Sequence, residues 1–138
     1  KIVVKDDIGV IFEKDLTLSE ANVSILRVSP KWYYSEYWGN SLDYACIELL
    51  NEGDIPACIG KMPISVGDEE VTGGVGLMDT EGYVKSGWLE HGNETFCVTG
   101  YSNVWVGGEN ILHLAVYNRS GFLIAKNDME ISLPYKTK

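Results

Sequence analysis

The chain has 138 residues, 45% of them hydrophobic, and 20 Asp and Glu against 11 Lys and Arg give a formal net charge of −9. This apolar content is enough for one domain with its own core and excludes a disordered chain. The excess of negative charge repels nucleic acid and anionic lipid, so we expect no nucleic-acid partner. No apolar run approaches the roughly 18 residues that a membrane-spanning helix needs, so we expect no membrane span.

The N-terminal segment, residues 1–12, carries two short apolar runs that we predict as strands. The chain starts at Lys1 without Met, as expected of a processed and exported protein. In one interpretation these runs are the first strand of their own domain. In the other, the segment is donated to the sheet of the next subunit, which produces a head-to-tail fibre. The residues that would then contact the neighbour are Ile2, Val4, Ile8, Val10 and Phe12.

The rest of the chain has the pattern of strands and turns. Runs rich in Val, Ile, Leu, Tyr and Thr are separated by Gly, Asn and Asp, and helix is limited to a turn or two near residues 16–22. Hairpin turns are predicted at 79–82 and 118–121. The sequence predicts one all-β domain over residues 1–138, an antiparallel β-sandwich of immunoglobulin-like or jelly-roll type. Strands are predicted at 2–5, 8–12, 22–29, 42–51, 55–59, 64–66, 74–78, 83–86, 94–101, 111–118, 122–125 and 129–133.

Five aromatic residues lie within seven positions between Pro30 and Gly39, in what we predict to be a loop. They are Trp32, Tyr33, Tyr34, Tyr37 and Trp38. One interpretation is a loop that caps one end of the sandwich, with the rings buried and their polar groups in water. A second is a protein interface, because Trp and Tyr are enriched in interface hot spots. A third is a carbohydrate-binding platform, because flat rings beside polar groups suit a sugar.

Three cysteines, Cys46, Cys58 and Cys97, cannot all pair within one chain. In the predicted strand 42–51, Cys46 lies on the face opposite Ala45 and Ile47, and alternation in 94–101 likewise places Cys97 on an outer face. If the two strands are neighbours, Cys46–Cys97 is within disulfide reach. A Cys58–Cys97 pair and no disulfide are the alternatives.

Three sequons mark the acceptor residues Asn22, Asn93 and Asn118 for N-linked glycans and favour an extracellular or cell-surface protein. The competing interpretation is three unmodified Asn at strand ends. His91 and His113 belong to no catalytic motif, and together with the cysteines they match no zinc spacing. The loop carboxylates lack a calcium-loop motif. We therefore expect no enzyme, no cofactor and no metal site.

Residues 45–57 form a strand, an N-x-G-x-x-P turn and a second strand. Asn51 and Gly53 supply the tight turn, and Pro56 starts the next strand without needing to donate a hydrogen bond. This hairpin resembles that of CARDB-like modules and of TasA- and camelysin-type biofilm-fibre subunits, including archaeal bundling-pilus and thread proteins. The resemblance implies a secreted, often glycosylated subunit that polymerises by donor-strand complementation and has no catalytic residues. The odd number of cysteines departs from that pattern.

The leading hypothesis from the sequence is a non-enzymatic extracellular structural subunit. It would form a pilus-like filament or surface assembly with copies of itself through the N-terminal strand. The alternative is a carbohydrate-binding or adhesion module that uses the aromatic residues 32–38. A small hydrolase is a distant third.

Overall fold

The structure, a computed structural model, describes residues 5–6, 9–10, 21–72 and 76–135. Strands β1 (Lys5–Asp6) and β2 (Gly9–Val10) form a two-stranded antiparallel sheet of their own and belong to neither of the two larger sheets. Of the predicted N-terminal contact residues, Ile2, Val4, Ile8 and Phe12 lie outside the described residues. Within the described part of the chain, no helix could cross a membrane.

The first large sheet contains three antiparallel strands in the order β3-β4-β9. These are β3 (Val23–Ser35), β4 (Gly39–Asn51) and β9 (Gly92–Thr99). Burial alternates along β4, where Ala45, Ile47 and Leu49 are completely buried while the residues between them contact solvent. Such a period of two is expected of a strand with one face on the core.

The second large sheet is organised around β10 (Gly108–Asn118), which pairs along its length with β11 (Leu123–Leu133). The other side of β10 pairs with β6 (Ile64–Val66) and, near its end, with β5 (Ala57–Lys61). Two short strands extend this sheet: β7 (Glu69–Glu70) beside β6, and β8 (Trp88–Leu89) beside β5.

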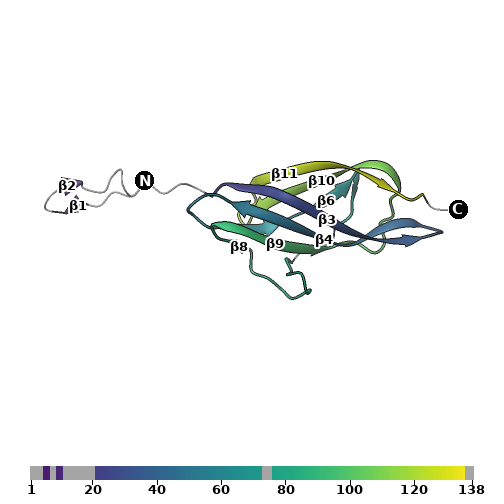
Figure 1. The fold of residues 1–138 in the computed structure, drawn as a ribbon, viewed down its shortest axis with the longest axis horizontal. Helices are drawn as coiled ribbons and strands as arrows, with labels where there is room; N and C mark the ends of the chain where they lie inside the picture. The colour runs from purple at the N-terminus through teal and green to yellow at the C-terminus, as the bar shows by residue number, and fades with distance from the viewer. Residues whose placement is uncertain (1–4, 7–8, 11–20, 73–75, 136–138) are drawn as a thin grey trace.

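The two sheets share one hydrophobic core, and Figure 1 shows them as the two layers of the body. Phe96 of β9, Ile47 of β4 and Leu112 of β10 are among its largest fully buried side chains. The all-β, antiparallel prediction is therefore confirmed. Strands β3, β4 and β9 form one sheet and the strands around β10 form the other, which is the two-sheet arrangement of a β-sandwich.

Two strands, β3 and β11, continue through residues that are predicted to lie outside strands. β3 continues through Pro30 to Ser35, so the aromatic segment is a hairpin end and the predicted loop is wrong. Proline is tolerated there because β3 is an edge strand, which among the described residues pairs with β4 alone. β11 likewise runs unbroken through Asn127 and Asp128, which pair with β10 and do not form the predicted break.

The segment between β7 and β8 contains less strand than predicted. Within its described residues, Met78 forms isolated bridges with Val84 and with Cys97 of β9, and neither predicted strand, 74–78 or 83–86, is present. The turn at 79–82 is confirmed, since Gly82 N–H donates to the carbonyl of Asp79 (3.1 Å). The turn at 118–121 is confirmed by the matching bond from Gly121 N–H to the carbonyl of Asn118 (2.9 Å).

The side chain of Asn51 connects three backbone segments by hydrogen bonds at the end of the sandwich where β3 begins. Its side chain is completely buried. The amide oxygen accepts from the N–H of Asn22 (3.0 Å) and of Gly53 (2.9 Å), while the amide nitrogen donates to the carbonyls of Ile55 (3.0 Å) and Leu89 (3.1 Å). One side chain therefore fixes the start of β3, the turn after β4 and the end of β8.

Candidate functional site: an aromatic cleft

A cleft of about 590 Å³ lies at the β3–β4 hairpin. Figure 1 shows this hairpin at the end of the sandwich where β11 ends. Its residues come from the end of β3, the hairpin turn, the start of β4 and the loop that follows β9. Three of them are aromatic and the rest are mainly small or polar. They are Tyr33, Ser35, Trp38, Ser41, Leu42, Asp43, Gly100, Ser102 and Trp105.

The hairpin turn positions Trp38. The hydroxyl oxygen of Ser35 accepts from the N–H groups of Tyr37 (3.2 Å) and Trp38 (3.3 Å). Gly39 follows with φ of +102°, a backbone conformation that residues with a Cβ rarely adopt. The turn is thus fixed on both sides of Trp38, whose side chain nevertheless stays 63% exposed.

Buried Asn40 positions Trp105 from the other side. The backbones of Asn40 and Val106 exchange two hydrogen bonds (2.9 and 2.8 Å), which pair the loop with the start of β4. The Asn40 side chain also donates to the carbonyls of Val106 (3.0 Å) and Pro134 (2.7 Å). Trp105 directly precedes this anchor, so its ring is supported by rigid backbone.

Gly100 lets the loop approach β4. Its N–H donates to the carbonyl of Asp43 (3.0 Å). A Cβ at this position would lie 2.0 Å from the carbonyl oxygen of Leu42, a distance that no side chain can tolerate. The close contact of loop and strand therefore requires glycine here.

The three rings form a continuous surface. The Trp105 ring lies 6.2 Å from that of Tyr33 at an interplanar angle of 56°, and 6.4 Å from that of Trp38 at 30°. A sugar ring held between two aromatic rings needs about 7–8 Å, twice the usual carbon–carbon contact distance. The gaps are smaller than this, so a ligand would stack on the outer faces of the rings. The neighbouring Ser35, Ser41, Ser102 and Asp43 provide hydrogen-bonding groups.

The structure separates the five aromatic residues that the sequence grouped together. Tyr33 and Trp38 line the cleft. Trp32 is partly buried and packs against the core, as the capping interpretation predicted for the whole segment. Tyr34 donates its hydroxyl hydrogen to the carbonyl of Tyr135 (3.0 Å), and Tyr37 lies exposed in the turn.

Sequence reasoning missed Trp105, Asp43 and the serines. Trp105 lies 67 positions after Trp38 in the chain. The available signal was a Trp in a predicted loop that contains Asn103 and Gly107, where an apolar ring has no predicted strand to support it. Only the pairing of Asn40 with Val106 shows where that ring lies.

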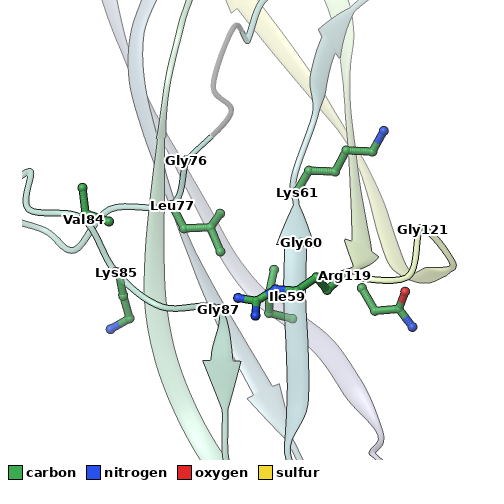
Figure 2. A pocket seen from close by; sticks show the side chains of 11 residues that line it. Ile59, Gly60, Lys61, Gly76, Leu77, Val84, Lys85, Gly87, Arg119 and Gly121 are labelled. Atoms are coloured by element: carbon green, nitrogen blue, oxygen red, sulfur yellow. The ribbon is translucent and has the colours of Figure 1, made fainter.

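A second hollow, of about 520 Å³, lies between β5 and the segment that leads into β8. Three cations line it: Lys61, Lys85 and Arg119. Figure 2 shows Lys61 and Lys85 pointing in opposite directions. Lys85 also forms an ion pair with Glu94 (2.8 Å), and the Lys61 ammonium lies 5.0 Å from the Tyr117 ring centroid. These cations do not converge on one position.

The three sequons lie at the end of the sandwich opposite the cleft. Asn22 precedes β3, Asn93 is near the start of β9, and Asn118 ends β10. The Asn93 side chain donates to Glu48 (2.9 Å), while the Asn118 amide oxygen accepts from the N–H of Phe122 (2.9 Å). Asn22 is exposed. Their glycosylation stays a prediction.

Cys46 and Cys97 form a disulfide between directly opposite residues of β4 and β9, on the face away from the core. Of the pairings left open by the sequence, this is the one in the structure. Cys97 is nevertheless buried, since the segment at Met78 covers it by exchanging two backbone hydrogen bonds (2.9 and 2.8 Å). Cys58 of β5 is a free, partly buried thiol.

Neither of the two histidines lines the aromatic cleft. His91 Nδ1 is 3.1 Å from the carbonyl oxygen of Gly53, and His113 Nδ1 is 2.7 Å from the carboxylate of Asp128 on β11. The described residues contain no group of three or more His, Cys, Asp and Glu placed to bind a metal ion.

No protein-family model matches this chain, and no curated protein matches it. The resemblance of residues 45–57 to fibre subunits stays a prediction.

Proposed function

We propose that this protein is a non-enzymatic, extracellular carbohydrate-binding or adhesion module, which holds a saccharide in the aromatic cleft. The observation that carries the proposal is the contiguous surface of Tyr33, Trp38 and Trp105 beside the hydroxyls of Ser35, Ser41 and Ser102. Pyranose rings have apolar C–H faces and polar edges, so they fit a site of flat rings with a polar border. The Cys46–Cys97 disulfide supports an oxidising, extracellular location.

The rigidity of the site also supports binding. Because the turn at Ser35 and the anchor at Asn40 hold Trp38 and Trp105 in place, little side-chain entropy is lost when a ligand stacks on them. Exposure of Trp38 (63%) and Tyr33 (60%) leaves these rings accessible. Exposed aromatic clusters on a fixed scaffold indicate a binding surface.

The test is a glycan array followed by pull-down with insoluble polysaccharides. We expect retention by at least one neutral polysaccharide and a loss of about tenfold in affinity for Trp105→Ala, since stacking and burial of an aromatic ring together contribute about 1.4 kcal/mol or more. Trp88→Ala is the matched control, because Trp88 is also exposed (53%) but lies on β8, outside the cleft. If no saccharide is retained, or if both variants lose affinity equally, the proposal is wrong.

The leading hypothesis from the sequence, a filament subunit, is a second candidate. Its specific support is that β1 and β2 belong to neither large sheet, while β3 and β11 are edge strands of the two sheets. Inward-facing residues of both edges, such as Ile25 and Met129, are only partly buried against the core. A strand donated by another copy would pair with such an edge and cover these residues.

Electron microscopy of the native material, with a variant lacking residues 1–12, tests this candidate. We expect filaments from the full chain and monomers from the shortened one. The full-length double variant Val10→Asp, Phe12→Asp keeps the chain length and is expected to behave like the shortened protein. Monomeric full-length protein, or filaments formed equally by all three, would exclude the N-terminal strand as the connector.

A further inference from the structure

Asp43 gives the aromatic cleft its charge. Of the described residues that line the cleft, Asp43 is the only one charged at neutral pH, and none of them is Lys, Arg or His. The whole chain, Asp43 included, has a net charge of −9. The potential in the cleft is therefore negative, and the low-dielectric rings beside the carboxylate strengthen its field.

The backbone holds Asp43 at the cleft. The pairing of β3 with β4 shifts register here, since Trp32 is opposite Leu42 and Lys31 is opposite Tyr44, so Asp43 is the extra residue of a β-bulge. Bulges redirect a side chain out of the regular alternation. The hydrogen bond from Gly100 N–H to the Asp43 carbonyl fixes this position, and the residue is exposed.

We infer that Asp43 determines which class of saccharide the cleft accepts, an inference that rests on the proposed function. A carboxylate accepts hydrogen bonds from sugar hydroxyls and attracts the ammonium of an amino sugar, but it repels uronate and sulfate groups. The cleft therefore binds amino sugars most tightly, neutral sugars less tightly and acidic sugars least. Stacking on the three rings is common to all of them, so the charge at Asp43 sets the order.

The probes are three tetrasaccharides with the same β-1,4-linked backbone. Cellotetraose is neutral, its fully deacetylated glucosamine counterpart is cationic, and its glucuronate counterpart is anionic. Affinities are measured by calorimetry in slightly acidic, low-salt buffer, where the amines are protonated. We expect the affinity to fall about five- to tenfold from the glucosamine to the neutral tetrasaccharide, and by the same factor from the neutral to the glucuronate one. This is the effect of one charge pair in contact near water at low salt. High salt should reduce these ratios.

Asp43→Asn is the decisive variant, because it keeps the size of the side chain and removes its charge. We expect the affinities for the three tetrasaccharides to become equal within about twofold. The remaining charges lie at the surface, where each changes a binding free energy only slightly. Asp68→Asn is the control, since it changes the net charge equally but lies in the exposed β6–β7 turn, outside the cleft. It should leave the order intact.

The outcomes separate the inference from the function beneath it. If the parent protein binds neither the tetrasaccharides nor any glycan of the array, the inference and the proposed function are both wrong. If it binds them without regard to charge, or if Asp43→Asn and Asp68→Asn change the ratios equally, Asp43 does not set specificity and the carbohydrate-binding proposal stands. If a protein partner is captured at the cleft while all saccharides fail, the inference is overturned.

Discussion

Replacing Asn51 by Ala tests the account of how the sandwich is closed at the end where β3 begins. The variant removes four hydrogen bonds at once. The bonds to Gly53 and Leu89 are buried, so their backbone partners lose a hydrogen bond where water cannot replace it, at about 1–3 kcal/mol each. The bonds to Asn22 and Ile55 are partly exposed, and water restores much of each, which leaves about 0.5 kcal/mol apiece.

The expected loss in the free energy of unfolding is therefore about 4 kcal/mol, a large part of the 5–15 kcal/mol that is typical of a domain. Urea denaturation followed by tryptophan fluorescence measures it. With a slope of about 2 kcal/mol per molar urea, the midpoint should fall by about 2 M. Protein from a host without N-glycosylation keeps the comparison free of attached sugars.

Asn93→Ala is the matched control. It removes one exposed hydrogen bond, to Glu48, and should change the stability by less than about 0.5 kcal/mol. A loss below about 1.5 kcal/mol for Asn51→Ala, or equal losses for the two variants, would refute the reasoning, since the buried partners would then have found other hydrogen bonds.

Two further stability predictions concern the disulfide and the loop that carries Trp105. The double variant Cys46→Ser, Cys97→Ser should lower the free energy of unfolding by about 4 kcal/mol, because the bond closes a loop of 51 residues; an unchanged urea midpoint would contradict this. Gly100→Ala should destabilise the protein by more than about 2 kcal/mol and weaken saccharide binding, since its Cβ would clash with the Leu42 carbonyl. Gly76→Ala, with nothing within 4 Å of the added Cβ, should be nearly neutral when both variants are compared by urea denaturation.

The parts of the fold that depend on local pattern were predictable from the sequence. Alternation of apolar residues places Ala45 and Ile47 on one face of β4 and Cys46 on the other, and this holds whatever strand lies alongside. The disulfide needed one more fact, that the strand of Cys97 is its neighbour. That fact is tertiary, so the sequence left the pairing open.

The aromatic segment shows where local reasoning fails. The predicted strand 22–29 stops before Pro30, but β3 is an edge strand and does not need the missing N–H there. Once β3 continues past Pro30, its regular alternation places Trp32 inward and Tyr33 outward. Which rings share a surface is decided by that continuation of β3 and by the distant anchor at Asn40, and neither leaves a mark in the spacing of the aromatics.

The most direct test of the proposed function uses the four tryptophans of the chain, Trp32, Trp38, Trp88 and Trp105, as internal probes. Their indole N–H signals are followed by two-dimensional NMR while a neutral oligosaccharide, chosen from the array, is added. We predict that the signals of Trp38 and Trp105 shift together and saturate, while those of Trp32, packed on the core, and Trp88, on β8, stay in place. Equal shifts of all four signals, or no shift at Trp38 and Trp105 with any saccharide, would contradict a binding site in the aromatic cleft.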